Sequence, residues 1–338
     1  MSPAKRSTKD AAAAGGNGQV GEEAEAYLAR LRTMILIRKF EDLVQSLFLR
    51  GEVYGSTHLC SGQEAVSVGV AAALGADDRI AATYRGHGHA LACGMSPQKF
   101  LDELIGRETG ICGGRAGSMN VVDLEHGLIG CFGIVGGSLA AATGAALALR
   151  RTGNVAVGFF GDGAVNQAYF YECANFARVL GLPVLYVCEN NGYGEYTPTE
   201  AVTPGGIVGR PAALDIPVSQ VDGQDVWAVH AAALEAVAEV RAGGGPFFLE
   251  ARTYRYTDHG RGDPIKYRSD EEMEEWRQRD PIDIARTRLA AEHGVEAARL
   301  DALVADVDAE IAELRSRALA APFPSPDVTV PEFAPAEA

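Results

Sequence analysis

The sequence has little positive charge, no paired cysteine motif and no long apolar run. Its 30 lysine and arginine residues are outnumbered by 45 aspartate and glutamate residues, which gives a formal net charge of -15. A polyanion such as DNA would meet an unfavourable field, so a nucleic-acid role is excluded. No stretch comes near the ~18 uncharged apolar residues of a membrane helix, and the N-terminal residues lack the apolar segment of a secretion signal. The sequence therefore predicts neither secretion nor a membrane span.

The six cysteines are scattered along the chain. They form no C-x-x-C pair, and no histidine stands at metal-ligand spacing from them. They therefore indicate reduced and mostly buried thiols, which suits the cytoplasm. The six are Cys60, Cys93, Cys112, Cys131, Cys173 and Cys188.

The order of apolar patterns predicts an α/β fold, with a parallel sheet covered by helices on both faces and a helical C-terminal segment. Residues 1–21 are rich in Ala and Gly and predict a disordered arm, residues 22–321 predict the folded domain, and residues 322–338 a Pro-rich tail. Helical periodicity starts at residue 22, and Gly51 stands where a C-cap is expected. Buried strands are predicted at residues 155–160, 183–188 and 247–254, helices at 166–180 and 225–241, and a charged helical segment from residue 271.

Residues 136–150 are unusually rich in small side chains for a soluble helix. Small residues let another backbone approach closely. This segment predicts either tight packing inside one subunit or a contact between subunits, and the sequence does not choose between them.

The segment from residue 155 to 193 carries the clearest chemistry. A buried strand delivers Gly161-Asp162-Gly163 to the carboxyl end of the sheet, where ligands of open α/β folds bind. Gly163 and Ala164 are expected to open a helix whose backbone N–H groups face a phosphate. The next strand ends in Glu189-Asn190-Asn191, which adds an amide oxygen at the same edge. Carboxylate and amide oxygens suit Mg²⁺, so the pair of turns predicts a metal–diphosphate clamp.

The order of the two turns, with one helix between them, resembles the thiamine-diphosphate motif of the 2-oxo acid dehydrogenase and transketolase superfamily. Further motifs, in the family order from about residue 28 to 281, resemble the alpha subunit of pyruvate dehydrogenase and its relatives. These motifs are His58-Leu59, Gly62-Gln63-Glu64-Ala65, Tyr84-Arg85-Gly86-His87-Gly88, Gly117-Ser118-Met119, Gly133-Ile134-Val135-Gly136, Tyr254-Arg255-Tyr256 and Asp263-Pro264. The resemblance implies a thiamine-diphosphate-binding fold.

The resemblance also implies roles for particular residues. Magnesium would be held by the side chains of Asp162 and Asn191 and by the backbone carbonyl of Tyr193. The diphosphate would be bound by Tyr84, Arg85, Arg255 and the backbone N–H groups of Gly163 and Ala164. Gly133 and Val135 would hold the aminopyrimidine ring, with the Val135 side chain propping the cofactor into a bent shape.

Two histidines match the active-site histidines of the family. His58 and His259 are implied as catalytic residues that move protons or bind the substrate, and His259 also as a cofactor contact. His87 and His89 are expected to line the site.

In this family the glutamate that protonates the aminopyrimidine nitrogen comes from a beta subunit. Glu64, the one tempting internal candidate, is expected instead at the start of a packed helix. The resemblance thus implies an alpha-two beta-two heterotetramer that decarboxylates pyruvate and reductively acylates the lipoyl group of an acyltransferase partner. Acetoin and branched-chain 2-oxo acid dehydrogenases are the alternatives within the family. A non-catalytic subunit that binds the cofactor for stability or regulation is the alternative from another class.

Overall fold

The computed structural model describes residues 16–260 and 266–326, with side chains from residue 21 onward. Residues 1–15, most of the predicted arm, and the end of the tail lie outside the described residues, as does the Asp263-Pro264 motif. The first helix, α1 (Gly16–Phe48), begins before residue 22, where we expected the arm to end. Propagating a helix adds one hydrogen bond for each residue fixed, so α1 extends into a sequence without apolar periodicity.

A six-stranded sheet forms the centre of the fold, as the sequence predicts. Its strand order is β2-β1-β3-β4-β8-β7, and every neighbouring pair is parallel. The strands are β1 (Arg79–Thr83), β2 (Leu128–Phe132), β3 (Ala156–Gly161), β4 (Val184–Asn190), β7 (Val218–Asp222) and β8 (Phe247–Arg252). A two-stranded antiparallel ribbon, β5 (Tyr193–Gly194) with β6 (Thr197–Pro198), follows β4.

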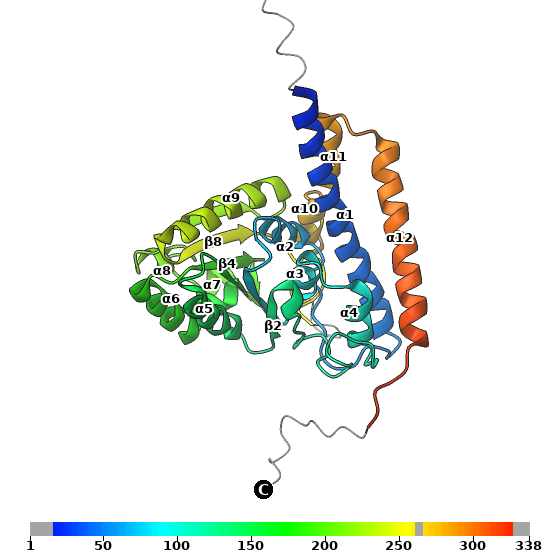
Figure 1. Cartoon of the computed structure of the whole chain (residues 1–338), viewed down its shortest axis with the longest axis horizontal. Helices are drawn as coiled ribbons and strands as arrows, with labels where there is room; N and C mark the ends of the chain where they lie inside the picture. Colours follow the sequence, from blue (N-terminus) through cyan, green and yellow to red (C-terminus); the bar gives the residue numbers. More distant parts are fainter. Residues whose placement is uncertain (1–15, 261–265, 327–338) are drawn as a thin grey trace, which may run out of the picture.

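Helices cover both faces of the sheet (Figure 1). Alternate strand residues enter two separate apolar clusters: Leu185 and Val187 of β4 face one, whereas Val184 and Tyr186 face the other. The first cluster includes α1, α2 (Glu64–Ala71), α3 (His87–Ala92), α4 (Pro97–Leu104) and α9 (Val226–Glu239). The second includes α5 (Gly137–Leu149) and α6 (Ala168–Leu180). Burial of both faces explains why the strands are continuous apolar runs.

The C-terminal segment is helical, which confirms the expectation. It contains α10 (Asp270–Arg277), α11 (Pro281–His293) and α12 (Ala297–Ala320). Figure 1 shows α12 running alongside α1, and the two helices are in contact. After α12 the chain docks on a loop near α4, where the carbonyl of Pro322 accepts a hydrogen bond from the Glu108 N–H and Phe323 lies under the Arg107 guanidinium.

The remaining elements are short. They are α7 (Thr199–Val202), α8 (Gly209–Ala212), the 3₁₀ turns η1 (Leu124–His126) and η2 (Asp162–Asn166), and the π-helical turn η3 (Val240–Gly244). The η2 turn corrects one expectation, since Gly163 and Ala164 open a 3₁₀ turn and not the long helix. Gln167 has extended backbone angles, which interrupt the helix until α6 begins at Ala168. No helix within the described ranges is both long enough and apolar enough to cross a membrane.

Candidate functional site

A cavity of about 470 Å³ opens at the carboxyl edge of the sheet. It is bordered by residues that directly follow β1, β2, β3 and β4, which is where ligands of parallel α/β sheets bind. All the predicted site residues except His58, His87, His89 and Gly133 line it. These are Tyr84, Arg85, Val135, Asp162, Gly163, Ala164, Asn191, Tyr193, Arg255 and His259.

Asp162 brings a nearly buried carboxylate to this cavity. It follows β3 directly and accepts a hydrogen bond from the Thr199 hydroxyl of α7. Burial raises the pKa of Asp162 to about 7, although backbone N–H groups and Arg255 oppose the rise. A cation beside this carboxylate would favour its ionised form, because it would offset the cost of taking the charge out of water.

Asn191 faces the same cavity from the neighbouring strand end. Its amide nitrogen donates to Gln63 Oε1 at 3.1 Å, and its amide oxygen accepts from the Tyr193 N–H at 3.3 Å. The ribbon that carries Tyr193 lies tightly against the Asp162 turn. A Cβ on Gly163 would lie 3.2 Å from Gly194 Cα, a tight contact, so this approach favours glycine. The turn after β3 and the turn after β4 therefore present three oxygen-bearing positions to one space.

Two buried arginines supply positive charge to the site, opposite in sign to the Asp162 carboxylate. Arg85 donates to the carbonyls of Leu59 and His259, the latter at 2.8 Å. Arg255 donates to the Glu195 carbonyl at 3.2 Å and to the Tyr267 hydroxyl at 2.6 Å.

All these partners are electrically neutral. Burial first, and then the nearby Arg85 charge, lower the pKa of Arg255 to about 10, and burial also lowers the pKa of Arg85. Arg255 Nε has no hydrogen-bond partner within the described part of the chain. An anion in the cavity would accept hydrogen bonds from both guanidinium groups and stabilise their charged forms.

His58, Tyr84 and His259 form an aromatic cluster at the cavity. The ring centroids of His58 lie 4.6 Å from Tyr84 and 5.1 Å from His259. His259 Nδ1 lies 3.0 Å from Arg255 Nη1. A guanidinium can only donate, so Nδ1 is the acceptor and the ring proton of this neutral imidazole lies on Nε2. The structure thus brings both predicted histidines together, although His58 itself does not line the cavity.

The loop after β2 forms another wall. Val135 and Ile134 line the cavity, whereas Gly133 does not. Ile134 is 70% exposed and Val135 43% exposed, and β2 is an edge strand of the sheet. The cavity therefore opens toward a free edge of this chain.

Three expectations about neighbouring residues have clear outcomes. His87 and His89 do not line the cavity, because both belong to the buried side of α3, which corrects the prediction. Glu64 is the fully buried first residue of α2 and forms an ion pair with Arg38 at 2.5 Å, which confirms its expected place in a packed helix.

Gln63 and Glu189 also line the cavity, which the sequence did not predict. Glu189 is 3% exposed, and its Oε1 has no hydrogen-bond partner among the residues described. His89 Nε2 lies 3.3 Å from that oxygen. The signal was present: Glu189 has the same strand parity as Asn191 and so points to the same side.

The small-residue helix α5 has two different sides. Leu139, Ala142 and Ala146 are buried against the sheet, whereas Ala140, Gly144 and Ala148 are exposed. Next to it, α6 exposes large apolar side chains. These are Tyr169, Tyr171, Phe176, Val179 and Leu180. Packing within the chain therefore accounts for only one side of α5.

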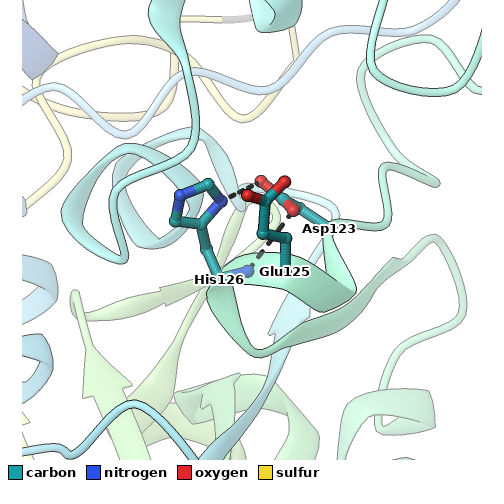
Figure 2. A group of neighbouring side chains, drawn as sticks. All are labelled: Asp123, Glu125 and His126. Atoms are coloured by element: carbon teal, nitrogen blue, oxygen red, sulfur yellow. Dashed lines mark hydrogen bonds and ion pairs between the residues drawn. The ribbon is translucent and has the colours of Figure 1, made fainter.

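A separate acidic group lies at the other end of β2, away from the cavity. Asp123, Glu125 and His126 have potential ligand atoms within 4.8 Å of one another. Figure 2 shows that the Asp123 carboxylate is engaged with His126, whose Nδ1 lies 2.8 Å from Oδ2 and whose N–H donates to Oδ1 at 3.4 Å. These contacts cap the η1 turn, so we assign the group a structural role.

Comparison with known proteins agrees with this geometry. The family described as "Dehydrogenase E1 component" matches residues 32–327. The alpha subunit of acetoin:2,6-dichlorophenolindophenol oxidoreductase from Bacillus subtilis is 46% identical over 262 residues, which cover 76% of this chain and 79% of that protein. The pyruvate dehydrogenase E1 component subunit alpha of Rhizobium meliloti is 42% identical over 90% of this chain and 88% of that protein, and that of Zymomonas mobilis 40% identical over 91% and 88%. The chain therefore belongs to the dehydrogenase E1 component family, which implies thiamine diphosphate as its cofactor.

Proposed function

We propose that this chain is the alpha subunit of an E1 component that decarboxylates pyruvate and passes the acyl group to the lipoyl group of an acyltransferase partner. One observation carries the proposal: a buried carboxylate and two buried arginines, none of which forms an ion pair within the described residues, face the same cavity. The ionised carboxylate and the charged arginines are each disfavoured in a low-dielectric site. A divalent cation would stabilise the carboxylate, and a diphosphate bound to that cation would stabilise the arginines.

The metal half of the site fits Mg²⁺. Asp162, Asn191 and the backbone carbonyl of Tyr193 offer only oxygen ligands, which this hard cation prefers. Asp162 is the single full charge among them, so the remaining charge of the ion is left for phosphate oxygens. Mg²⁺ commonly binds through one or two carboxylates together with substrate phosphates.

The phosphate half would use the two arginines and the η2 turn. Arg85 and Arg255 can turn N–H groups toward phosphate oxygens, and Tyr84 adds a hydroxyl. Gly163 and Ala164 start a 3₁₀ turn whose first N–H groups have no backbone carbonyl as partner inside the turn. Those N–H groups would donate to the diphosphate.

The bound cofactor supplies a carbon nucleophile and an electron sink, which protein side chains do not provide. The protein positions the substrate and handles protons. His259 carries its proton on Nε2 while Arg255 holds Nδ1, so it can donate to a substrate carbonyl or carboxylate. His58 packs against the same ring and would act with it.

A beta subunit is required to complete the site. Glu64 is committed to Arg38, and Glu189 pairs in register with Gly161 at the diphosphate end. The aminopyrimidine ring is expected beside Gly133 and Val135, at the end of β2. Three strand spacings separate β2 from β4, which is about 14 Å. The activating glutamate would therefore come from a partner at the free β2 edge.

The exposed apolar side chains of α6 support the same partner. A patch of this kind on a soluble protein marks an interaction site. We propose that α5 and α6 belong to the subunit contacts of an alpha-two beta-two heterotetramer. We also propose a cytoplasmic location, which is supported by six free cysteines.

Acetoin is the second candidate substrate. The Bacillus subtilis relative that is named for acetoin shares 46% of its residues with this chain over the matched region. Pyruvate carries a carboxylate and acetoin does not, so the two substrates make different demands on the site. Comparing their turnover in one assay separates the two proposals.

The test is reconstitution. The chain and its beta subunit would be mixed with Mg²⁺ and thiamine diphosphate, and turnover of pyruvate, acetoin and branched-chain 2-oxo acids measured with an artificial electron acceptor. Turnover of pyruvate supports the leading proposal, and turnover of acetoin alone supports the second. Absence of both turnover and cofactor binding would refute the site assignment.

A further inference from the structure

A buried chain of hydrogen bonds links α1, α3 and the 116–118 loop behind the cavity. Glu41 of α1 accepts from His87 Nδ1 at 2.8 Å, and His87 Nε2 lies 2.8 Å from the Ser118 hydroxyl. The second carboxylate oxygen of Glu41 accepts from the backbone N–H of Cys60 at 2.7 Å. Glu41 and His87 are fully buried, and Ser118 is 3% exposed.

The arrangement Ser118–His87–Glu41 has the connectivity of a nucleophilic triad, but its surroundings exclude that role. Ser118 does not line the cavity, and its burial denies access to a substrate. Phe100 packs edge-on against the His87 ring at 5.1 Å between centroids. A polar chain of this kind in an apolar environment is costly unless every member is paired. We therefore expect this hydrogen-bond chain to hold a neighbouring backbone segment in place.

The Glu41 carboxylate is well suited to hold a backbone segment. Burial alone would raise its pKa, but the electrostatic interaction with His87, together with the hydrogen bonds from His87 and Cys60, outweighs burial and lowers it. Glu41 is therefore an anion, and hydrogen bonds to an ionised group are the stronger kind. His87 fixes one carboxylate oxygen, so the other is aimed at the Cys60 N–H.

The segment that Glu41 holds is the one that carries His58. Leu59, the residue after His58, is held from the other side, because Arg85 of the cavity wall donates a hydrogen bond to the Leu59 carbonyl. Two charged and buried groups thus hold both ends of a single peptide group, the one between Leu59 and Cys60, one residue after His58. We propose that Glu41, itself held by His87, is a positioning residue that sets the placement of His58 for catalysis. This inference rests on the catalytic role of His58 in the proposed function.

Two substitutions separate placement from charge. Glu41→Asp keeps the charge but withdraws the carboxylate by one methylene, so it cannot reach both His87 and Cys60. Glu41→Gln loses the charge but can keep both contacts, since its amide oxygen accepts from Cys60 and its amide N–H donates to His87 Nδ1. Thr143→Val is the matched control: it removes a buried hydroxyl contact with Tyr186 on the opposite face of the sheet.

The reconstituted enzyme should respond in a specific way. Glu41→Asp should lower kcat by ~10²-fold, the effect of misplacing a reacting group by about 1 Å. Cofactor affinity should stay within about threefold, because the interaction acts in the transition state and not in binding. Glu41→Gln and Thr143→Val should both stay near the wild-type kcat.

A double variant tests the route through His58. His58→Gln should lower kcat by ~10²–10⁴-fold, and adding Glu41→Asp should lower it no further. Additive losses would overturn the proposal, as would a wild-type kcat in Glu41→Asp or an equal loss in Glu41→Gln. A wild-type kcat in His58→Gln would overturn it too, since His58 would then need no placement.

Hydrogen–deuterium exchange of the same assembly gives a readout that does not depend on turnover. Peptides that span residues 57–63 should exchange faster in Glu41→Asp than in the wild type or Glu41→Gln. Unchanged exchange in Glu41→Asp would show that Glu41 does not hold this segment. If the wild-type assembly turned over none of the substrates, the proposed function would fail, and the exchange result would still decide whether Glu41 holds the His58 segment.

Discussion

Asp162→Asn should stabilise the cofactor-free chain above neutral pH, although it damages the site. The pKa of Asp162 is raised from 3.8 to about 7, so the folded state binds this proton more tightly than the unfolded state does. The free energy of unfolding should therefore fall as pH rises from about 4 to about 7. The difference between 3.8 and about 7, at ~1.4 kcal/mol for each pH unit, sets the cost at about 4 kcal/mol at pH 8. Asparagine removes that charge, so the variant should be more stable by up to this amount.

Urea unfolding of the purified chain in chelator, at pH 5 and pH 8, measures the effect. The gain in the free energy of unfolding should be larger at pH 8 than at pH 5. Asp78→Asn is the matched control, because Asp78 is equally buried but forms an ion pair with Arg241 and accepts from the Val155 N–H at 2.8 Å. That variant should lose stability at pH 8.

The same Asp162→Asn variant should bind Mg²⁺ and thiamine diphosphate poorly in the assembled enzyme. Truncating one partner of a buried charge pair costs about 2–5 kcal/mol, which corresponds to roughly 30-fold or more in affinity. Calorimetric titration measures it. A variant that binds the cofactor as well as the wild type, or that is no more stable at pH 8, would refute the electrostatic reasoning.

The remaining predictions concern the other parts of the site. His259→Ala should keep cofactor affinity within a few-fold but lower kcat by ~10²–10⁴-fold in steady-state assays, and unchanged turnover would return the residue to a structural role. Arg255→Met should weaken diphosphate binding by roughly 10–100-fold in a calorimetric titration, the worth of a hydrogen bond to a charged group. The chain alone should be silent, and activity should appear with the beta subunit and saturate at a one-to-one ratio. Robust activity of the chain alone that Glu189→Gln abolishes would show that the missing glutamate is internal.

The elements that were predictable from sequence depend on local chemistry. The strands β3, β4 and β8 are short apolar runs, and the turns after β3 and β4 are marked by Asp162-Gly163 and Asn191-Gly192. Asp225 shows the same principle at α9, where its side chain accepts from the Trp227 N–H and caps the predicted helix start. Because parallel strands end at one edge, knowing where β3 and β4 end was enough to bring Asp162 and Asn191 together.

The features that the sequence did not reveal depend on contacts between distant segments. Glu41 and His87 stand 46 positions apart, and neither lies in a motif that specifies its partner. His87 follows the cavity residue Arg85 closely in sequence, which suggested a place in the cavity, but the tight turn into α3 points its ring into the apolar core. The register that places Glu189 beside Gly161 is likewise a property of the assembled sheet.

The charges of the site explain why its two halves belong together. Without a ligand, Asp162 is held in a place that disfavours its ionised form, and Arg85 and Arg255 are held in places that disfavour theirs. Direct pairing across the cavity would satisfy both but would fill the space that a cofactor needs. The fold prevents this, because Arg85 is tied to the carbonyls of Leu59 and His259, and Asp162 to the Thr199 hydroxyl. The chain therefore keeps opposite charges apart at a cost in stability, and a ligand that carries both a cation and an anion recovers that cost on binding.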